Sequence, residues 1–162
     1  MPTCCEVLVA GSEVSCFGRF PRASLLDLAV PTILAALKDA GIEAADLNAA
    51  FVGNAFGGLM QNQETILGQI LLASAGISAI PIHNIKNACS SGADAAHLAW
   101  ASVAHGQYDC VLVLGVEKMT HADRTKAMTA LATATDRKPA DPGRSPRQCA
   151  GVTENRMRVC TA

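Results

Sequence analysis

The sequence predicts an α/β fold in which parallel strands alternate with helices. Short apolar runs bounded by turn residues recur between segments of helical periodicity along the chain. Strands separated by helices pair in parallel through right-handed crossovers. Half of the 162 residues are hydrophobic and only 4% are aromatic. This composition is typical of one globular domain with an interior rich in small residues.

The N-terminal part of the chain predicts a strand followed by a helix. Residues 6–10 form a short apolar run, which we interpret as a first buried strand. Ser24 and Asp27 have the spacing of a capping box at the start of a helix of about 16 residues. Gly41 stands where a C-cap glycine belongs. Because Pro31 lies past the first turn, it removes one backbone hydrogen bond, and we expect it to kink the helix.

The middle of the chain continues the alternation of strands and helices. The apolar runs predict strands over residues 49–53, 80–86 and 109–116. The helical patterns cover residues 63–74 and 90–105, and the glycine-containing segment 54–60 is expected to be a mobile loop.

The last part of the chain differs from the rest in composition. A helical pattern follows Met119 and ends before Arg137. Residues 137–162 hold six lysines and arginines against two acidic residues and contain three prolines, with no periodic apolar face. We therefore divide the chain into an α/β domain over residues 1–118 and, over 119–162, the start of a loop region followed by a basic, proline-rich tail expected to be disordered.

Charge and cysteine content exclude several classes of function. The formal net charge of -1 gives no reason to expect nucleic acid as a partner. Seven cysteines without zinc-type spacing predict neither a metal site nor a disulfide framework, and a reducing compartment is the simpler interpretation. No signal, transit or peroxisomal motif and no membrane span is evident, so the expected location is the cytoplasm.

The segment Asn87 to Gly92 (NACSSG) is the strongest candidate for chemistry. It lies between a predicted strand and a predicted helix, so Cys89 would face the first unpaired N–H groups of that helix. Their partial positive charge favours a thiolate, and such N–H groups can also donate to a thioester oxyanion. Taken alone, the pattern more often indicates a small buried cysteine with no chemical role.

Six segments occur in a fixed order along the chain: FGRF at 17–20, ALKDAGI at 36–42, FVGN at 51–54, NACSSG at 87–92, GQYD at 106–109 and GVEKMT at 115–120. Together they resemble the N-terminal half of the thiolases, including acetyl-CoA acetyltransferases and sterol-carrier-type thiolases. The resemblance covers about residues 5–135. NACSSG alone would also fit the ketoacyl synthases, and GVEKMT favours thiolase.

The resemblance implies a fold, a reaction and a nucleophile. The fold is a three-layer α/β domain with a mixed, mostly parallel sheet. In the reaction, Cys89 accepts an acyl group from a CoA thioester, and its backbone N–H contributes to the oxyanion site. This corresponds to thiolysis of a 3-ketoacyl-CoA or to formation of acetoacetyl-CoA. The resemblance implies acyl-CoA or CoA as substrate and no permanently bound cofactor.

In the family, the activating histidine and a second cysteine come from the C-terminal half, which nothing after Met119 resembles. None of the local histidines offers a convincing base. His97 is about 12 Å along the helix from Cys89. His121, in the loop after the last predicted strand, is the only one with any path toward the thiol, and we do not expect it to act as the base. We therefore expect a truncated chain with an incomplete active site. Glu117 and Lys118 either form a solvated pair or brace the loop region, and the resemblance favours bracing.

Two alternatives to a free-standing enzyme remain open. One is a non-catalytic fragment that binds acyl-CoA or forms a homodimer through residues 80–86, the segment through which thiolases pair their subunits. The other is a product of truncation or of a shifted reading frame without a function of its own. The change of composition near residue 137 motivates this second alternative.

Overall fold

A computed structural model describes residues 6–134, and it confirms the α/β fold class. Three strands form a parallel sheet in the order β2-β1-β3: β1 is Ala49–Gly53, β2 is Ile82–Ile85 and β3 is Val111–Gly115. Gly53, the last residue of β1, is in register with Ile85 and Gly115, the last residues of its neighbours. The carboxyl ends of all three strands therefore meet at one edge of the sheet. The sheet is wholly parallel over the described residues, where a mixed sheet was expected.

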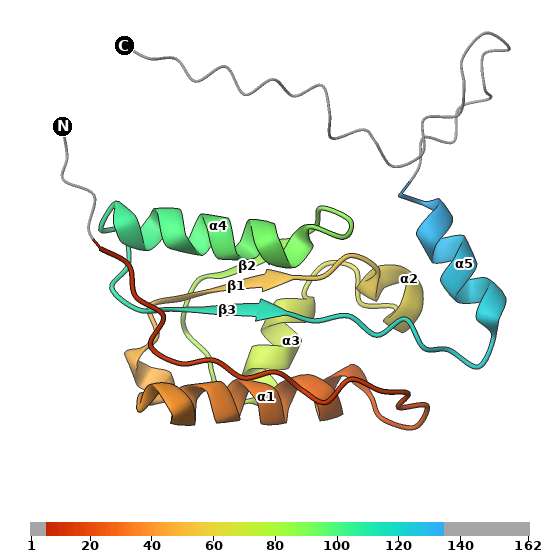
Figure 1. The fold of residues 1–162 in the computed structure, drawn as a ribbon, viewed down its shortest axis with the longest axis horizontal. Helices are drawn as coiled ribbons and strands as arrows, with labels where there is room; N and C mark the ends of the chain where they lie inside the picture. The colour runs from red at the N-terminus through yellow and green to blue at the C-terminus, as the bar shows by residue number, and fades with distance from the viewer. Residues whose placement is uncertain (1–5, 135–162) are drawn as a thin grey trace, which may run out of the picture.

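Helices cover both faces of the sheet (Figure 1). Helix α4 (Ser91–Ala104) covers one face, and α1 (Leu25–Ala40) and α3 (Leu67–Ser74) lie on the other. A short helix, α2 (Gly57–Gln61), and α5 (Arg124–Ala132) contact each other beyond the carboxyl ends of the strands. A 3₁₀ turn at Ala44–Asp46 leads into β1.

The core forms two layers because side chains alternate along the central strand. All five residues of β1 are buried. Ala50 and Val52 face the larger cluster with α1 and α3, whereas Ala49 and Phe51 pack with Ala95 and Ala99 of α4. The small side chains of α4 thus allow its close approach to the sheet, as the sequence predicted.

Helix α1 has the predicted ends. The Ser24 hydroxyl accepts a hydrogen bond from Asp27 N, and the Asp27 carboxylate accepts one from Ser24 N, which completes the capping box. These contacts hold the pKa of Asp27 below its usual range. Gly41 ends the helix with φ +68°, a left-handed conformation that favours glycine. The helix runs without a break through Pro31.

The prediction of a first strand over residues 6–10 is wrong. The segment has no regular structure, and the side chains of Leu8 and Val9 are exposed. A strand requires a neighbour to accept its backbone hydrogen bonds, and this segment pairs with none of the three strands. Ser12 N instead donates to the Asp39 carboxylate near the end of α1.

Two helix starts also differ from the prediction. The segment 54–60, expected to be a mobile loop, contains α2, and the helix expected from residue 63 begins at Leu67. Neither helix has a side-chain cap from its own N-cap residue. Side chains of other residues supply acceptors at both starts: Asn54 and Glu117 near the start of α2, and Asn84 at the start of α3. The predicted disordered tail lies outside the described residues.

Candidate active site

Cys89 lies in the turn that joins β2 to α4. It follows the carboxyl end of β2 and precedes Ser91, the first residue of α4, by two positions. The thiol is free, and the residue is exposed. In open parallel sheets, ligands bind at the carboxyl ends of the strands. The sequence therefore placed Cys89 correctly at a strand-to-helix turn, and the alternative of a buried cysteine does not fit this exposure.

The backbone on both sides of Cys89 is fixed by local hydrogen bonds. The Ser91 hydroxyl accepts from Asn87 N at 2.9 Å and donates to the carbonyl oxygen of Ala88 at 2.8 Å. The Asn87 side-chain amide donates to the Asp94 carboxylate in the first turn of α4. Ala88 has φ +44°, which is uncommon for a residue with a Cβ. The turn therefore has a defined and locally strained shape.

Glycines let the start of α4 approach the strand ends. A Cβ on Gly53 would lie 2.5 Å from the carbonyl oxygen of Ser91 and 2.7 Å from the nitrogen of Gly92. Gly115 faces Gly92, and a Cβ there would meet the Gly92 Cα at 3.8 Å. The end of the central strand is thus in direct contact with the helix start that follows Cys89.

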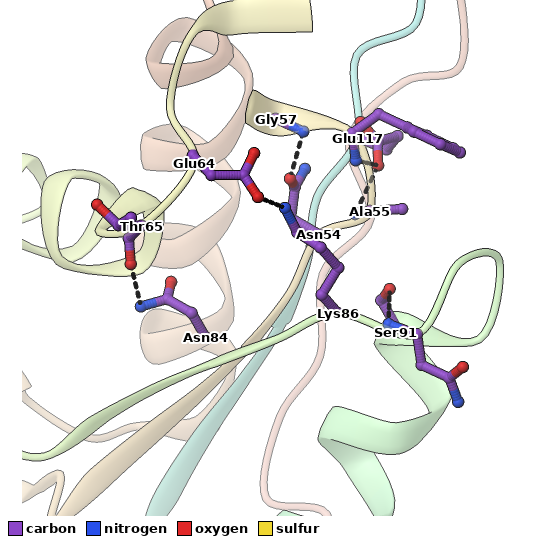
Figure 2. Close-up of polar contacts among 11 residues, drawn as sticks. Asn54, Ala55, Gly57, Glu64, Thr65, Asn84, Lys86, Ser91 and Glu117 are labelled. Carbon is purple, nitrogen blue, oxygen red and sulfur yellow. Dashed lines mark hydrogen bonds and ion pairs between the residues drawn. The ribbon is translucent and has the colours of Figure 1, made fainter. Parts of the chain in front are cut away.

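Asn54 joins the ends of the three strands. It is 8% exposed, its backbone N–H donates to the carbonyl of Ile85, and its side-chain amide donates to the carbonyl of Val116 at 2.7 Å. Its side-chain oxygen accepts from Gly57 N at 2.6 Å, at the start of α2 (Figure 2). Sequence reasoning quoted this residue only as part of a motif and missed its structural role.

Glu117 braces the loop that follows β1, as the resemblance suggested. One oxygen of its carboxylate accepts from Ala55 N at 2.9 Å and from Phe56 N at 3.1 Å (Figure 2). These two N–H groups precede α2, which has no cap of its own. Lys118 contributes through its backbone, because its carbonyl accepts from the Gln61 side chain.

A second polar cluster holds the start of α3 against β2. The side-chain oxygen of Asn84 accepts from Gly68 N at 2.7 Å, and its amide group donates to the Gln69 side chain. Lys86 forms an ion pair with Glu64 at 2.6 Å (Figure 2). Both charged side chains are largely exposed, so the pair contributes little stability.

The four histidines have local roles. His83 stacks on Phe51, His97 stacks on Trp100, and His105 contacts the carbonyl of Ala101. His121 Nδ1 accepts from the Asp123 N–H at 3.0 Å. None of the hydrogen bonds found over residues 6–134 joins a histidine to Cys89. The structure therefore gives no support to His121 as a base.

Cys110 has the environment of a core residue. It packs against the larger hydrophobic cluster just before β3, and burial, together with the nearby Asp46 carboxylate, raises the pKa of its thiol. In the part of the chain that the structure describes, no three His, Cys, Asp or Glu side chains are grouped as metal ligands. The helices described there are all too short or too polar to cross a membrane.

The fold and the Cys89 turn together indicate the class. The family model for the N-terminal domain of thiolase matches residues 7–150. The chain belongs to the thiolase family, and the resemblance drawn from its motifs is confirmed.

Relatives share this N-terminal part. The chain is 39% identical over 131 residues to an acetyl-CoA acetyltransferase of Methanothermobacter thermautotrophicus, and 37% identical over 131 residues to one of Methanocaldococcus jannaschii. Each alignment covers 81% of this chain and 33% of the relative. Sterol carrier protein 2 of Bos taurus is 38% identical over 93 residues, which cover 57% of this chain and 16% of that protein. The chain thus spans about a third of the length of the archaeal relatives.

Proposed function

We propose that this chain carries the acyl-accepting half of a thiolase-type active site, with Cys89 as the nucleophile. The observation that carries the proposal is the exposed Cys89 thiol in a rigid turn before α4, within a chain of the thiolase family. The archaeal relatives bear the name acetyl-CoA acetyltransferase. That name supports a CoA thioester as substrate.

The covalent step is a thioester exchange. The sulfur of the Cys89 thiolate attacks the carbonyl carbon of an acyl-CoA, and the carbonyl oxygen becomes negatively charged in the tetrahedral intermediate. The backbone N–H of Cys89 is our candidate donor to that oxygen, assisted by the N–H groups of the first turn of α4. When the bond to the CoA sulfur breaks, CoA leaves as a thiolate and takes up the proton that the Cys89 thiol released to solvent.

The second half of the reaction determines the product. Transfer of the acyl group to a carbon nucleophile attached to CoA forms acetoacetyl-CoA, and the reverse reaction cleaves a 3-ketoacyl-CoA. Both directions require a proton donor and acceptor at the reacting atoms. No histidine in residues 6–134 forms a hydrogen bond with Cys89, so we assign only the thioester exchange to the described residues.

A non-catalytic role is the second candidate, and one observation favours it. Strand β2 is an edge of the sheet, and its outer side has no partner strand over the described residues. An open groove beside it is lined by Phe51, His83, Leu98 and Tyr108. An unpaired edge is a template for adding a strand from another chain. A homodimer through residues 80–86 would use this edge.

An isotope exchange assay tests the catalytic proposal. The protein is incubated with acetyl-CoA and labelled free CoA, and the label that enters acetyl-CoA is measured. We expect exchange by the wild type and none by Cys89→Ala, with Cys16→Ala as the matched control, because Cys16 is also exposed but lies outside the turn. Exchange that persists in Cys89→Ala would refute the assignment. A wild type that forms a dimer and binds CoA without exchange would favour the non-catalytic role.

A further inference from the structure

Ser91 is a buried polar residue two positions after the proposed nucleophile. It is 4% exposed, and Asn54 is the other polar residue buried to this degree among the described residues. A buried hydroxyl is costly unless it is hydrogen-bonded. The apolar pattern of α4 explains why Ala95 and Ala99 are buried, but it does not explain why a hydroxyl is buried at its first position.

The Ser91 hydroxyl forms its two hydrogen bonds within the Cys89 turn. It accepts from Asn87 N at 2.9 Å and donates to the carbonyl oxygen of Ala88 at 2.8 Å. The Ala88 carbonyl belongs to the peptide unit that carries the Cys89 N–H, and Asn87 N lies two peptide units earlier. Backbone bonds from Ser90 N to the Asn87 carbonyl (2.9 Å) and from Ser91 N to the Ala88 carbonyl (3.3 Å) also hold the turn. The Ser91 side chain adds to these bonds a contact with the chain as it leaves β2 and a second contact with the peptide plane of the proposed nucleophile.

The bond to Ala88 also stabilises an uncommon backbone conformation. Ala88 has φ +44°, where a Cβ is sterically disfavoured. Such a residue keeps its conformation only when its surroundings determine it, and strain of this kind is concentrated at functional sites. Loss of the hydroxyl would leave this conformation to the two backbone bonds of the turn alone, and we expect the direction of the Cys89 side chain to be less well defined.

Ser91 itself is held by the sheet. The closeness of its backbone to Gly53 means that the start of α4 has no room to shift toward β1. The end of the central strand therefore limits where Ser91 can lie, and the Ser91 hydroxyl in turn holds the backbone of the two residues before Cys89. The Ser90 side chain, by contrast, caps no N–H group of α4 and is exposed.

We propose that Ser91 is a positioning residue, whose hydroxyl holds the Asn87–Ala88 backbone so that the Cys89 sulfur is presented to an incoming electrophile. The inference rests on the proposed function, because it supposes that Cys89 reacts. It goes beyond that proposal by assigning to one buried side chain a part in the shape of the turn.

Alkylation of Cys89 tests the proposal independently of acyl transfer. The rate of modification by iodoacetamide is followed on the Cys89 peptide by mass spectrometry over a range of pH. We compare Ser91→Ala, Ser91→Thr and the control Ser90→Ala with the wild type. Ser91→Ala should change the rate about tenfold and alter its pH profile, since the Asn87 N–H loses its acceptor and the Ala88 carbonyl keeps only the longer bond from Ser91 N at 3.3 Å. Ser91→Thr keeps the hydroxyl and should restore the wild-type profile, and Ser90→Ala should match the wild type.

The outcomes separate this inference from the proposed function. If Ser91→Ala reacts like Ser90→Ala, or if Ser91→Thr restores nothing, the positioning role is refuted, whether or not the wild type exchanges CoA. If Ser91→Ala differs from Ser91→Thr and Ser90→Ala as expected but the wild type fails in the exchange assay, the positioning role stands and the acyltransferase proposal fails. If Ser91→Ala does not fold, amide hydrogen exchange of the wild type decides: the Asn87 N–H should be protected although the residue is exposed, and rapid exchange would refute the inference.

Discussion

Replacement of Gly53 by alanine tests whether the Cys89 turn is fixed by contact with the central strand. The added Cβ would lie 2.5 Å from the Ser91 carbonyl oxygen, and ordinary contact begins at 3.4 Å. The two segments must therefore move apart by about 0.9 Å. Because the obstructing atoms are backbone, no change of rotamer relieves the clash.

The cost follows from this geometry. Overpacking of a well-packed core costs about 1–3 kcal/mol, and the small gain that alanine brings over glycine in a strand offsets only part of it. For a domain of this size, we expect the Tm of Gly53→Ala to fall by roughly 5–10 °C. Displacement of the start of α4 should also change the alkylation rate of Cys89.

Gly115→Ala provides the matched control. Gly115 is in register with Gly53 on the neighbouring strand, and a Cβ there would meet its nearest atom at an ordinary 3.8 Å. Its unfolding free energy should stay within about 0.5 kcal/mol of the wild type. Urea denaturation of both variants measures the difference. Equal stabilities of Gly53→Ala and Gly115→Ala would refute the account of close contact.

Two further predictions concern the brace and the second thiol. Glu117→Ala should lower the unfolding free energy by about 1 kcal/mol, because Ala55 N and Phe56 N lose their acceptor. Glu117→Gln keeps an amide oxygen as acceptor and should lose less stability. Equal losses of the two variants in urea denaturation would contradict the bracing role. Burial and the Asp46 carboxylate raise the pKa of Cys110, so at pH 8 its thiolate fraction is smaller than that of a free thiol. Its alkylation in the folded protein should be slower than in urea and should accelerate only at higher pH, and equal rates would contradict the assignment.

Much of the fold could be predicted from local patterns. The capping box at Ser24, the glycine at the end of α1, the apolar run of β3 and the small-residue face of α4 are each contained within a few turns or one strand. The position of Cys89 between a strand and a helix is equally local. These predictions succeeded because the interactions that determine them join residues close together in the sequence.

The features that local sequence patterns do not predict depend on long-range contacts. Asn54 bonds to Val116, 62 positions away, and Glu117 caps the backbone before α2 from a similar separation. These contacts exist because β3 lies next to β1 in the sheet. The periodicity of apolar residues predicts which segments are strands, but it does not reveal the order in which the strands lie. The wrong strand at residues 6–10 has the same cause, since an apolar run does not show whether a partner strand is available.

The role of Ser91 was missed for a different reason. Sequence reasoning noted only that Ser90 and Ser91 are small. Both serines occur at the start of the same helix, and only the backbone conformation of the turn distinguishes the buried hydroxyl from the exposed one. The two serines matter differently because Ala88 has a left-handed backbone conformation. The sequence does not indicate this conformation, since alanine rarely adopts it.

The central claim is that Cys89 accepts an acyl group, and intact-protein mass spectrometry after incubation with acetyl-CoA tests it most directly. We predict a mass increase of one acetyl group, mapped to the Cys89 peptide, removed by hydroxylamine and absent from Cys89→Ala. A wild type that acquires no acetyl group while Cys89 remains open to alkylation, or an adduct that persists in Cys89→Ala, would contradict the account.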